Sequence, residues 1–207
     1  MRASPLHLAF LVVGIVALAV SGYQPVDPFT WVLEIFPAVI GTAVMIATYR
    51  RFRLTTLLYA LILLHAMILM LGGHYTYANV PLGFWMQDAF GFTRNHYDRI
   101  GHFAQGFVPA MIARELFLRH RIVKPGAWLF AVIVLCCLGI SAIYELVEWW
   151  TAELSGSAAE AFLGTQGDPW DTQKDMFMAG IGATVPMLTL SRVHDAALKT
   201  VPPSPES

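Results

Sequence analysis

The chain has 207 residues, of which 57% are hydrophobic and 13% are charged, and its formal net charge is −1. In an average soluble domain about a quarter of the residues are charged, so this composition indicates an integral membrane protein. The length suffices for about six spans of about 20 residues and leaves no room for a separate soluble domain. A near-neutral charge without a long basic run excludes nucleic acid as an expected partner and leaves membrane lipids.

Apolar runs predict an all-α, polytopic membrane bundle with about six transmembrane helices, forming one domain over residues 1–198. Four runs approach the length that crosses a hydrocarbon core of about 30 Å, at about 6–22, 29–49, 54–73 and 127–148. A less apolar segment at 97–118 suits a helix that neighbouring helices shield from lipid.

The last predicted span covers about 169–191 and begins with a start signal. Asp168 is expected to be the N-cap, Pro169 the first helical residue and Asp171 an acid in the first turn. Residues 199–207 read as a disordered, solvated tail.

The basic residues lie mainly on one side of these predicted spans. Ten of the 13 Lys and Arg residues fall there, and Arg94, Arg99 and Lys174 fall on the other side together with most of the acids. The positive-inside rule makes the basic side cytoplasmic, which places both termini in the cytoplasm of a bacterial inner-membrane protein. The first span also resembles a secretory signal peptide, since Arg2 precedes an apolar core and small residues; its removal would leave the later orientation unchanged.

Ionisable residues collect where three predicted spans reach the outer face. Three pairs each share one face of a helix, because their members stand three or four residues apart: Asp98 with His102, Glu145 with Glu148, and Asp171 with Asp175. Charged groups in hydrocarbon are costly, about 2.5–3.5 kcal/mol each on the insertion scale, so a group of them requires compensation. Three helices can therefore aim these side chains at a common point.

A divalent metal ion is one compensation that fits these residue types. Like-charged carboxylates tolerate one another beside a cation, and the expected ligands are Asp98, His102, Glu145, Asp171 and Asp175. Oxygen ligands with one imidazole suit Mg, Mn, Fe or Zn. The catalytic candidates are Arg99, His102, Glu145 and Glu148, with a carboxylate as base and Arg99 as a phosphate clamp.

The alternative explanation is structural: the acids cap helix ends and pair with Arg99 and Lys174 in the headgroup layer. For a second cluster, His74 and His96 either complete the site or are solvated interface histidines. Gly72 and Gly73 are expected to let the backbone turn after the third span.

Two further polar residues lie inside the second and third predicted spans. Glu34 and His65 are expected to form a hydrogen-bonded pair or part of a proton path. Phosphate-binding, zincin, nucleophile-elbow and CxxC motifs do not occur in the chain, which removes the main support for ordinary nucleotide, zinc-protease and serine-hydrolase functions.

Several uncommon polar strings in apolar surroundings carry a family resemblance. ILLHAMILMLGGHYTYANVP is followed by RNHYDRIGHFAQGF, YELVEWW and GDPWDTQKDM. Over about residues 60–190 this order resembles the YjdF-like bacterial inner-membrane family, and more distantly the VanZ-like proteins, which are linked to glycopeptide resistance. The first resemblance implies the fold and the site, and it implies no reaction.

Three functions remain open from the sequence. The site can belong to a metal-assisted or acid/base enzyme that acts on a lipid-linked or envelope substrate. It can bind or transport a cation or protons, or it can fix helix packing in an accessory protein.

Overall fold

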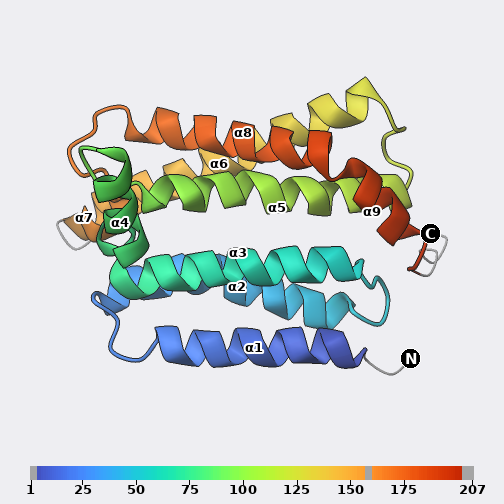
Figure 1. The fold of residues 1–207 in the computed structure, drawn as a ribbon, viewed down its shortest axis with the longest axis horizontal. Helices are drawn as coiled ribbons and strands as arrows, with labels where there is room; N and C mark the ends of the chain where they lie inside the picture. The colour runs from blue at the N-terminus through green and yellow to red at the C-terminus, as the bar shows by residue number, and fades with distance from the viewer. Residues whose placement is uncertain (1–3, 157–159, 202–207) are drawn as a thin grey trace.

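The protein is built from α-helices, and the computed structural model describes residues 4–156 and 160–201. The long helices form two groups that lie side by side (Figure 1). The first group comprises α1 (Pro5–Ser21), α2 (Pro28–Thr48) and α3 (Thr56–Tyr75), and the second comprises α5 (Tyr97–Arg119), α6 (Ala127–Ser155) and α8 (Asp171–Thr189). The predicted all-α fold is thereby confirmed.

Short elements cover the two ends of the bundle. The 3₁₀ turn η1 (Tyr77–Asn79), α4 (Pro81–Phe90) and α7 (Glu160–Leu163) lie at one end, and α9 (Ser191–Leu198) lies at the other, beside both termini (Figure 1). Of the predicted tail, residues 202–207 lie outside the described part of the chain.

Helix α5 joins the two groups, because it packs on α3 as well as on α6 and α8. Its contact with α8 depends on glycine: a Cβ at Gly106 would collide with the backbone of Ala179 and Ala183, and one at Gly182 would collide with the backbone of Phe103. Small residues allow such close helix approach in membranes. The ionisable residues His102, Arg114 and Glu115 of α5 are buried within the bundle.

Three helices of the described chain are long and apolar enough to cross a membrane, namely α2, α3 and α6. The count rises to four if α8 and α9, which meet at a bend of 63°, form one broken span. The apolar helix α1 is shorter, at 17 residues. The count of six spans stays a prediction, and α5 would cross as a helix shielded by its neighbours.

Two local predictions about helix ends were wrong. Helix α8 begins at Asp171 with Trp170 as its N-cap residue, and the Asp168 carboxylate accepts a hydrogen bond from the Trp170 N–H at 3.0 Å one turn earlier. Asp168 therefore stabilises the turn before the helix. The predicted first-turn position of Asp171 is confirmed.

The other error concerns Gly72 and Gly73, which lie inside α3. A Cβ at Gly72 would collide with the ring of Tyr77, and one at Gly73 would come within 3.1 Å of the Glu34 Cβ. These glycines permit close packing, and the chain turns only at Thr76, whose φ is 58°.

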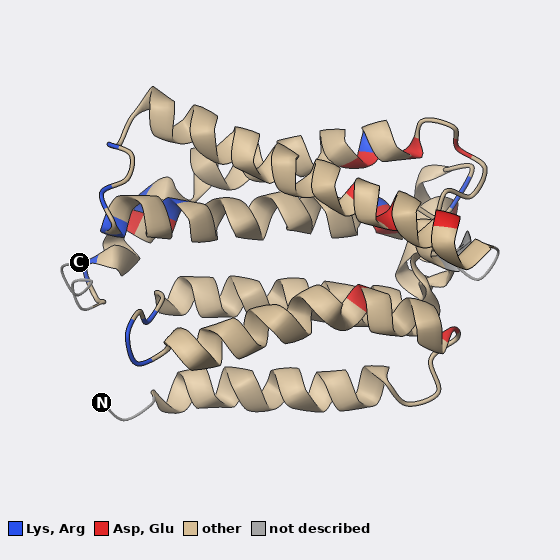
Figure 2. Ribbon diagram, turned by 180° about the vertical axis from the view of Figure 1, so that it is seen from behind, with Lys and Arg blue, Asp and Glu red and all other residues tan. Residues whose placement is uncertain are grey.

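Charge divides the molecule lengthwise. Lys and Arg gather at the end that holds both termini, whereas Asp and Glu gather at the opposite end (Figure 2). We refer to these as the arginine-rich end and the acidic end. The positive-inside rule predicts that the arginine-rich end is cytoplasmic.

Candidate functional site

The acidic end brings together the three pairs of ionisable residues that the sequence indicated, one pair on each of three helices. Helix α5 supplies Asp98, Arg99 and His102, helix α6 supplies Glu145 and Glu148, and helix α8 supplies Asp171 and Asp175. His102, Glu145, Glu148, Asp171 and Asp175 are all buried. We call this group of seven residues the outer site, because the predicted orientation places it at the periplasmic face.

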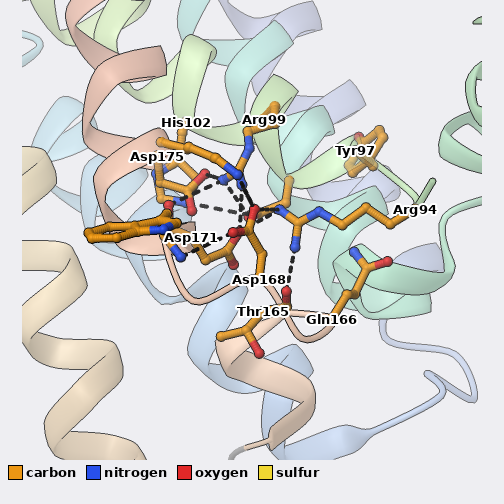
Figure 3. A network of polar contacts seen from close by, with 12 residues as sticks. Arg94, Tyr97, Arg99, His102, Thr165, Gln166, Asp168, Asp171 and Asp175 are labelled. Carbon is orange, nitrogen blue, oxygen red and sulfur yellow. Dashed lines mark hydrogen bonds and ion pairs between the residues drawn. The ribbon is translucent and has the colours of Figure 1, made fainter. Parts of the chain in front are cut away.

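Arg99 holds α5 and α8 together within the outer site. Its guanidinium group donates to the Asp171 carboxylate at 2.5 Å and also to the carboxylate of Asp175. Figure 3 shows Arg94 and Arg99 converging on the carboxylates of Asp168, Asp171 and Asp175. Planar guanidinium groups suit such multiple charge-assisted bonds. The Asp171 carboxylate is thus engaged by two arginines.

His102 lies at the centre of the remaining carboxylates. Its Nε2 is 3.4 Å from an Asp98 oxygen and 3.7 Å from an Asp175 oxygen, and its Nδ1 is 3.7 Å from a Glu145 oxygen. Nδ1 also lies 3.2 Å from the amide oxygen of Gln105. One ligand atom each from Asp98, His102 and Asp175 lies within 4.8 Å of the other two, a spacing that can hold a metal ion.

Glu145 has an unsatisfied oxygen that faces this cluster. Its side chain is 7% exposed, and Oε1 accepts no hydrogen bond from the described residues. On the same face of α6, one turn inward, the hydroxyl of fully buried Ser141 also has no partner. Buried polar groups normally find a partner, so the Glu145 oxygen is a candidate ligand for a cation.

Excess negative charge is the main electrostatic property of the outer site. Arg94, Arg99 and Lys174 pair mainly with Asp168, Asp171 and Asp175, and Asp98 has a longer contact of 3.8 Å with Arg99 besides its contact with His102. Among the described residues Glu145 and Glu148 form no ion pair with an arginine or a lysine. Carboxylates at close range either retain protons or require a cation. The residues therefore have the composition of a cation site.

An open pocket lies at the start of α8, and Asp171 is the outer-site residue that lines it. Its volume is about 380 Å³, and its lining includes Thr165, Asp168, Asp171 and Thr172. Beside it, Lys174 donates to Asp168 at 2.6 Å, and this bond, followed by the one from the Trp170 N–H, lowers the pKa of the Asp168 carboxyl. Asp168 is thus held ionised at the mouth of the pocket.

Glu34 approaches the outer site instead of pairing with His65. The buried Glu34 carboxylate of α2 accepts a hydrogen bond from the Tyr144 hydroxyl of α6 at 3.3 Å, and the rings of Tyr144 and His102 lie edge to face with centroids 6.3 Å apart. His65 Nε2 has no hydrogen-bond partner among the described residues. The predicted pairing was wrong, because Tyr144 reaches Glu34 from the next group of helices.

The two interface histidines have different surroundings. His74 Nδ1 lies 2.8 Å from the carbonyl oxygen of Ser21, so it ties α3 to α1. His96 precedes α5, its ring packs edge-on against Phe92, and burial, followed by the charge of Arg94, lowers its pKa. His74 thus points away from the outer site, and His96 is a neutral neighbour of it.

Sequence reasoning missed Arg94, and it missed a second buried network at the arginine-rich end. There Glu115 accepts hydrogen bonds from Thr55 Oγ1 and Arg119, both at 2.8 Å, and lies 3.0 Å from His194 Nε2. Glu115 and His194 are each 0% exposed. The signal in the sequence was the charged pair Arg114 and Glu115 in the interior of α5, but no pattern indicated His194 as their partner.

Comparison with known proteins agrees with this architecture. Residues 6–196 match the family described as "Predicted membrane protein (DUF2238)". The chain is 50% identical over 183 residues to the inner membrane protein YjdF of Escherichia coli strain K12, which covers 88% of this chain and 87% of that protein. No solved structure matches the chain, and the more distant VanZ-like resemblance stays a prediction.

The matched segment extends from the first helix to α9, so it includes every residue of the outer site. The relative is an inner-membrane protein, and this chain has several apolar helices of spanning length. The chain therefore belongs to the DUF2238 family of membrane proteins, as a multi-pass protein of the bacterial inner membrane.

Proposed function

We propose that the outer site binds one divalent metal ion and that the protein is a metal-assisted enzyme of the periplasmic face. The single observation that carries this proposal is the gathering of ligand atoms from Asp98, His102 and Asp175 within 4.8 Å. Oε1 of Glu145, which lies 3.7 Å from His102 and accepts no hydrogen bond from the described residues, adds a fourth donor. An imidazole with several carboxylate oxygens suits Mg, Mn, Fe or Zn.

The division of roles follows from what each side chain already contacts. Asp98, His102 and Asp175 are the proposed ligands, because their ligand atoms lie close together, and Asp175 is bonded to Arg99 alone of the two arginines. Asp171, which the sequence also proposed, is engaged by both Arg94 and Arg99. Glu145 is the proposed general base, and the buried carboxyl of Glu148 lies one turn further along the same helix.

The arginines indicate the class of substrate. Arg94 and Arg99 both bind Asp171, which lines the open pocket, and guanidinium groups bind phosphate oxygens in the same forked geometry as carboxylates. We therefore propose a phosphate-bearing, lipid-linked envelope substrate. In hydrolysis, water would attack phosphorus, Glu145 would accept the proton of the water, and the same proton would pass to the leaving oxygen.

The test is turnover by the protein in lipid nanodiscs with a panel of lipid-linked phosphates and pyrophosphates. We expect metal-dependent phosphate release that chelation abolishes and that Glu145→Gln lowers by about 100-fold or more, the usual weight of a general base. Glu153→Gln, a change on an exposed turn of the same helix, is the control. Equal rates for wild type and Glu145→Gln, or no product from the panel, would contradict the proposal.

A second candidate function is cation or proton binding with transport. It is favoured by Glu34, because its bond to Tyr144 extends the acidic cluster into the first group of helices. Proteoliposomes would then show an ion or proton flux that Glu34→Gln abolishes. Flux that is absent from the wild type, or is unchanged in this variant, would contradict transport.

A further inference from the structure

A long apolar slot lies between α1 and α2, with α3 as its floor, far from the outer site. Its volume is about 360 Å³. The walls include Gly14 and Leu18 of α1, Ala38 and Thr42 of α2, and Leu63 and Met70 of α3. The lining is almost wholly apolar along its length: apart from Thr42, its polar residues gather at one end, where His7, Tyr49, Arg50 and Tyr59 lie.

Hydrogen bonds join the two ends of α1 to the neighbouring helices, and the slot lies between them. At the arginine-rich end the ring nitrogens of His7 lie 2.9 Å from the Tyr49 hydroxyl and 3.0 Å from the Thr56 hydroxyl. At the other end the Trp31 indole donates to the Ser21 hydroxyl at 3.2 Å. Between these hydrogen bonds α1 and α2 each pack on α3, and the slot separates α1 from α2.

The dimensions of the slot match one leaflet of a bilayer. Its lining on α1 extends from His7 to Leu18, which is about 16 Å at 1.5 Å per residue. Half of a hydrocarbon core of about 30 Å has the same depth. On α2 the lining extends from Ala38 to Ile46, the half of that helix nearest the arginine-rich end, and it continues to Tyr49 and Arg50 just after the helix.

The polar end of the slot carries an unpaired positive charge. Arg50 lines the rim, and none of the ion pairs among the described residues involves it. The rings of His7 and Tyr59, with centroids 4.3 Å apart, close the slot beneath this rim. The acids gather at the opposite end of the molecule (Figure 2), so the rim attracts anions.

We propose that this slot binds one acyl chain of an anionic phospholipid from the leaflet at the arginine-rich end, with the lipid phosphate against Arg50. An apolar slot inside a bilayer that stays empty forfeits van der Waals contacts along its walls, and a lipid tail restores them. A basic residue at the membrane surface favours an anionic headgroup. This lipid site is independent of the outer site, since the two lie at opposite ends of the bundle.

The experiment measures phospholipid that stays bound after mild detergent extraction, by native mass spectrometry, followed by re-addition of phosphatidylglycerol or phosphatidylethanolamine. The wild type should retain one phospholipid and prefer the anionic one. Gly14→Leu places a side chain in the middle of the slot and should remove most of the bound lipid. Its matched control is Gly41→Leu, because a Cβ at Gly41 meets no atom within 4 Å and Gly41 is not part of the lining.

The charge is tested separately from the slot. Arg50→Gln should lower the preference for phosphatidylglycerol by about five-fold, the equivalent of one surface cation, whereas Arg51→Gln removes the same charge outside the lining and should change it little. Thr42→Leu fills the slot from α2 and replaces Gly14→Leu if that variant fails to fold. Wild type without bound lipid, full retention in the filled variants, or equal effects of the two arginine variants would overturn the proposal.

Discussion

At the scale of single residues, Arg99 is the link on which the outer site depends. It bonds to Asp171 and Asp175, and its side chain is 11% exposed. Arg99→Gln should lower the stability of the protein by about 3 kcal/mol or more, because it leaves buried carboxylates without their partner. Thermal unfolding in detergent measures the effect.

The matched comparison is Lys174→Gln, which also removes one cation from the acidic end. Lys174 is 53% exposed and pairs with Asp168 at 2.6 Å. Exposed pairs are worth about 0–1 kcal/mol, so the melting temperature should change little. Equal losses in the two variants would contradict the role given to Arg99.

The second buried network predicts a similar contrast at the arginine-rich end. Glu115 joins α3, α5 and α9 through Thr55, Arg119 and His194, whereas Asp195, whose side chain is 55% exposed, accepts from Arg114 alone. Glu115→Ala should therefore lower the melting temperature far more than Asp195→Ala. A small effect of Glu115→Ala would mean that α9 does not depend on this network.

The sequence predicts residues whose partners lie on the same helix and misses many whose partners do not. Asp98 and His102 stand one turn apart on α5, so helical spacing alone brings them together. The bonds from Arg94 to Asp171 and from Tyr144 to Glu34 join residues 77 and 110 positions apart. Such pairings depend on how helices pack, which residue spacing does not encode.

At the scale of elements, the contact between α5 and α8 positions the outer site. Gly106→Ala would drive a Cβ into the backbone of Ala179, and such overpacking costs about 1–3 kcal/mol. Gly139→Ala in α6 meets no atom within 4 Å, so the better helix propensity of alanine should leave the protein equally or more stable. Melting temperatures that fall alike in both variants would contradict this packing.

Long helices were predicted well because each needs a long apolar run, whereas short ones were not. Helix α6 continues past the predicted span 127–148 to Ser155, through a segment that includes the polar residues Thr151 and Glu153. Helices α4 and α9 are 10 and 8 residues long, and their stability depends on packing against the ends of the bundle.

At the scale of the whole molecule, the separation of charge predicts how the protein lies in the membrane. Lys124 and Lys174 are both exposed, at the arginine-rich end and the acidic end respectively. We expect Lys174→Cys to react with a membrane-impermeant thiol reagent in intact spheroplasts, and Lys124→Cys to react only after lysis. Both variants are made in a background without Cys136 and Cys137. The reverse pattern of labelling would invert the orientation and place the outer site in the cytoplasm.

The proposed function of the protein depends on whether the outer site holds a metal ion. The most direct measurement is the metal content of the protein, extracted without chelators, by inductively coupled plasma mass spectrometry. Asp98→Asn and His102→Gln are compared with Asp88→Asn, which lies on α4 outside the outer site. We predict one divalent metal ion per chain in the wild type and in Asp88→Asn, and loss of that ion in the other two variants. A wild type that remains metal-free after incubation with Mg, Mn, Fe and Zn would contradict the central claim.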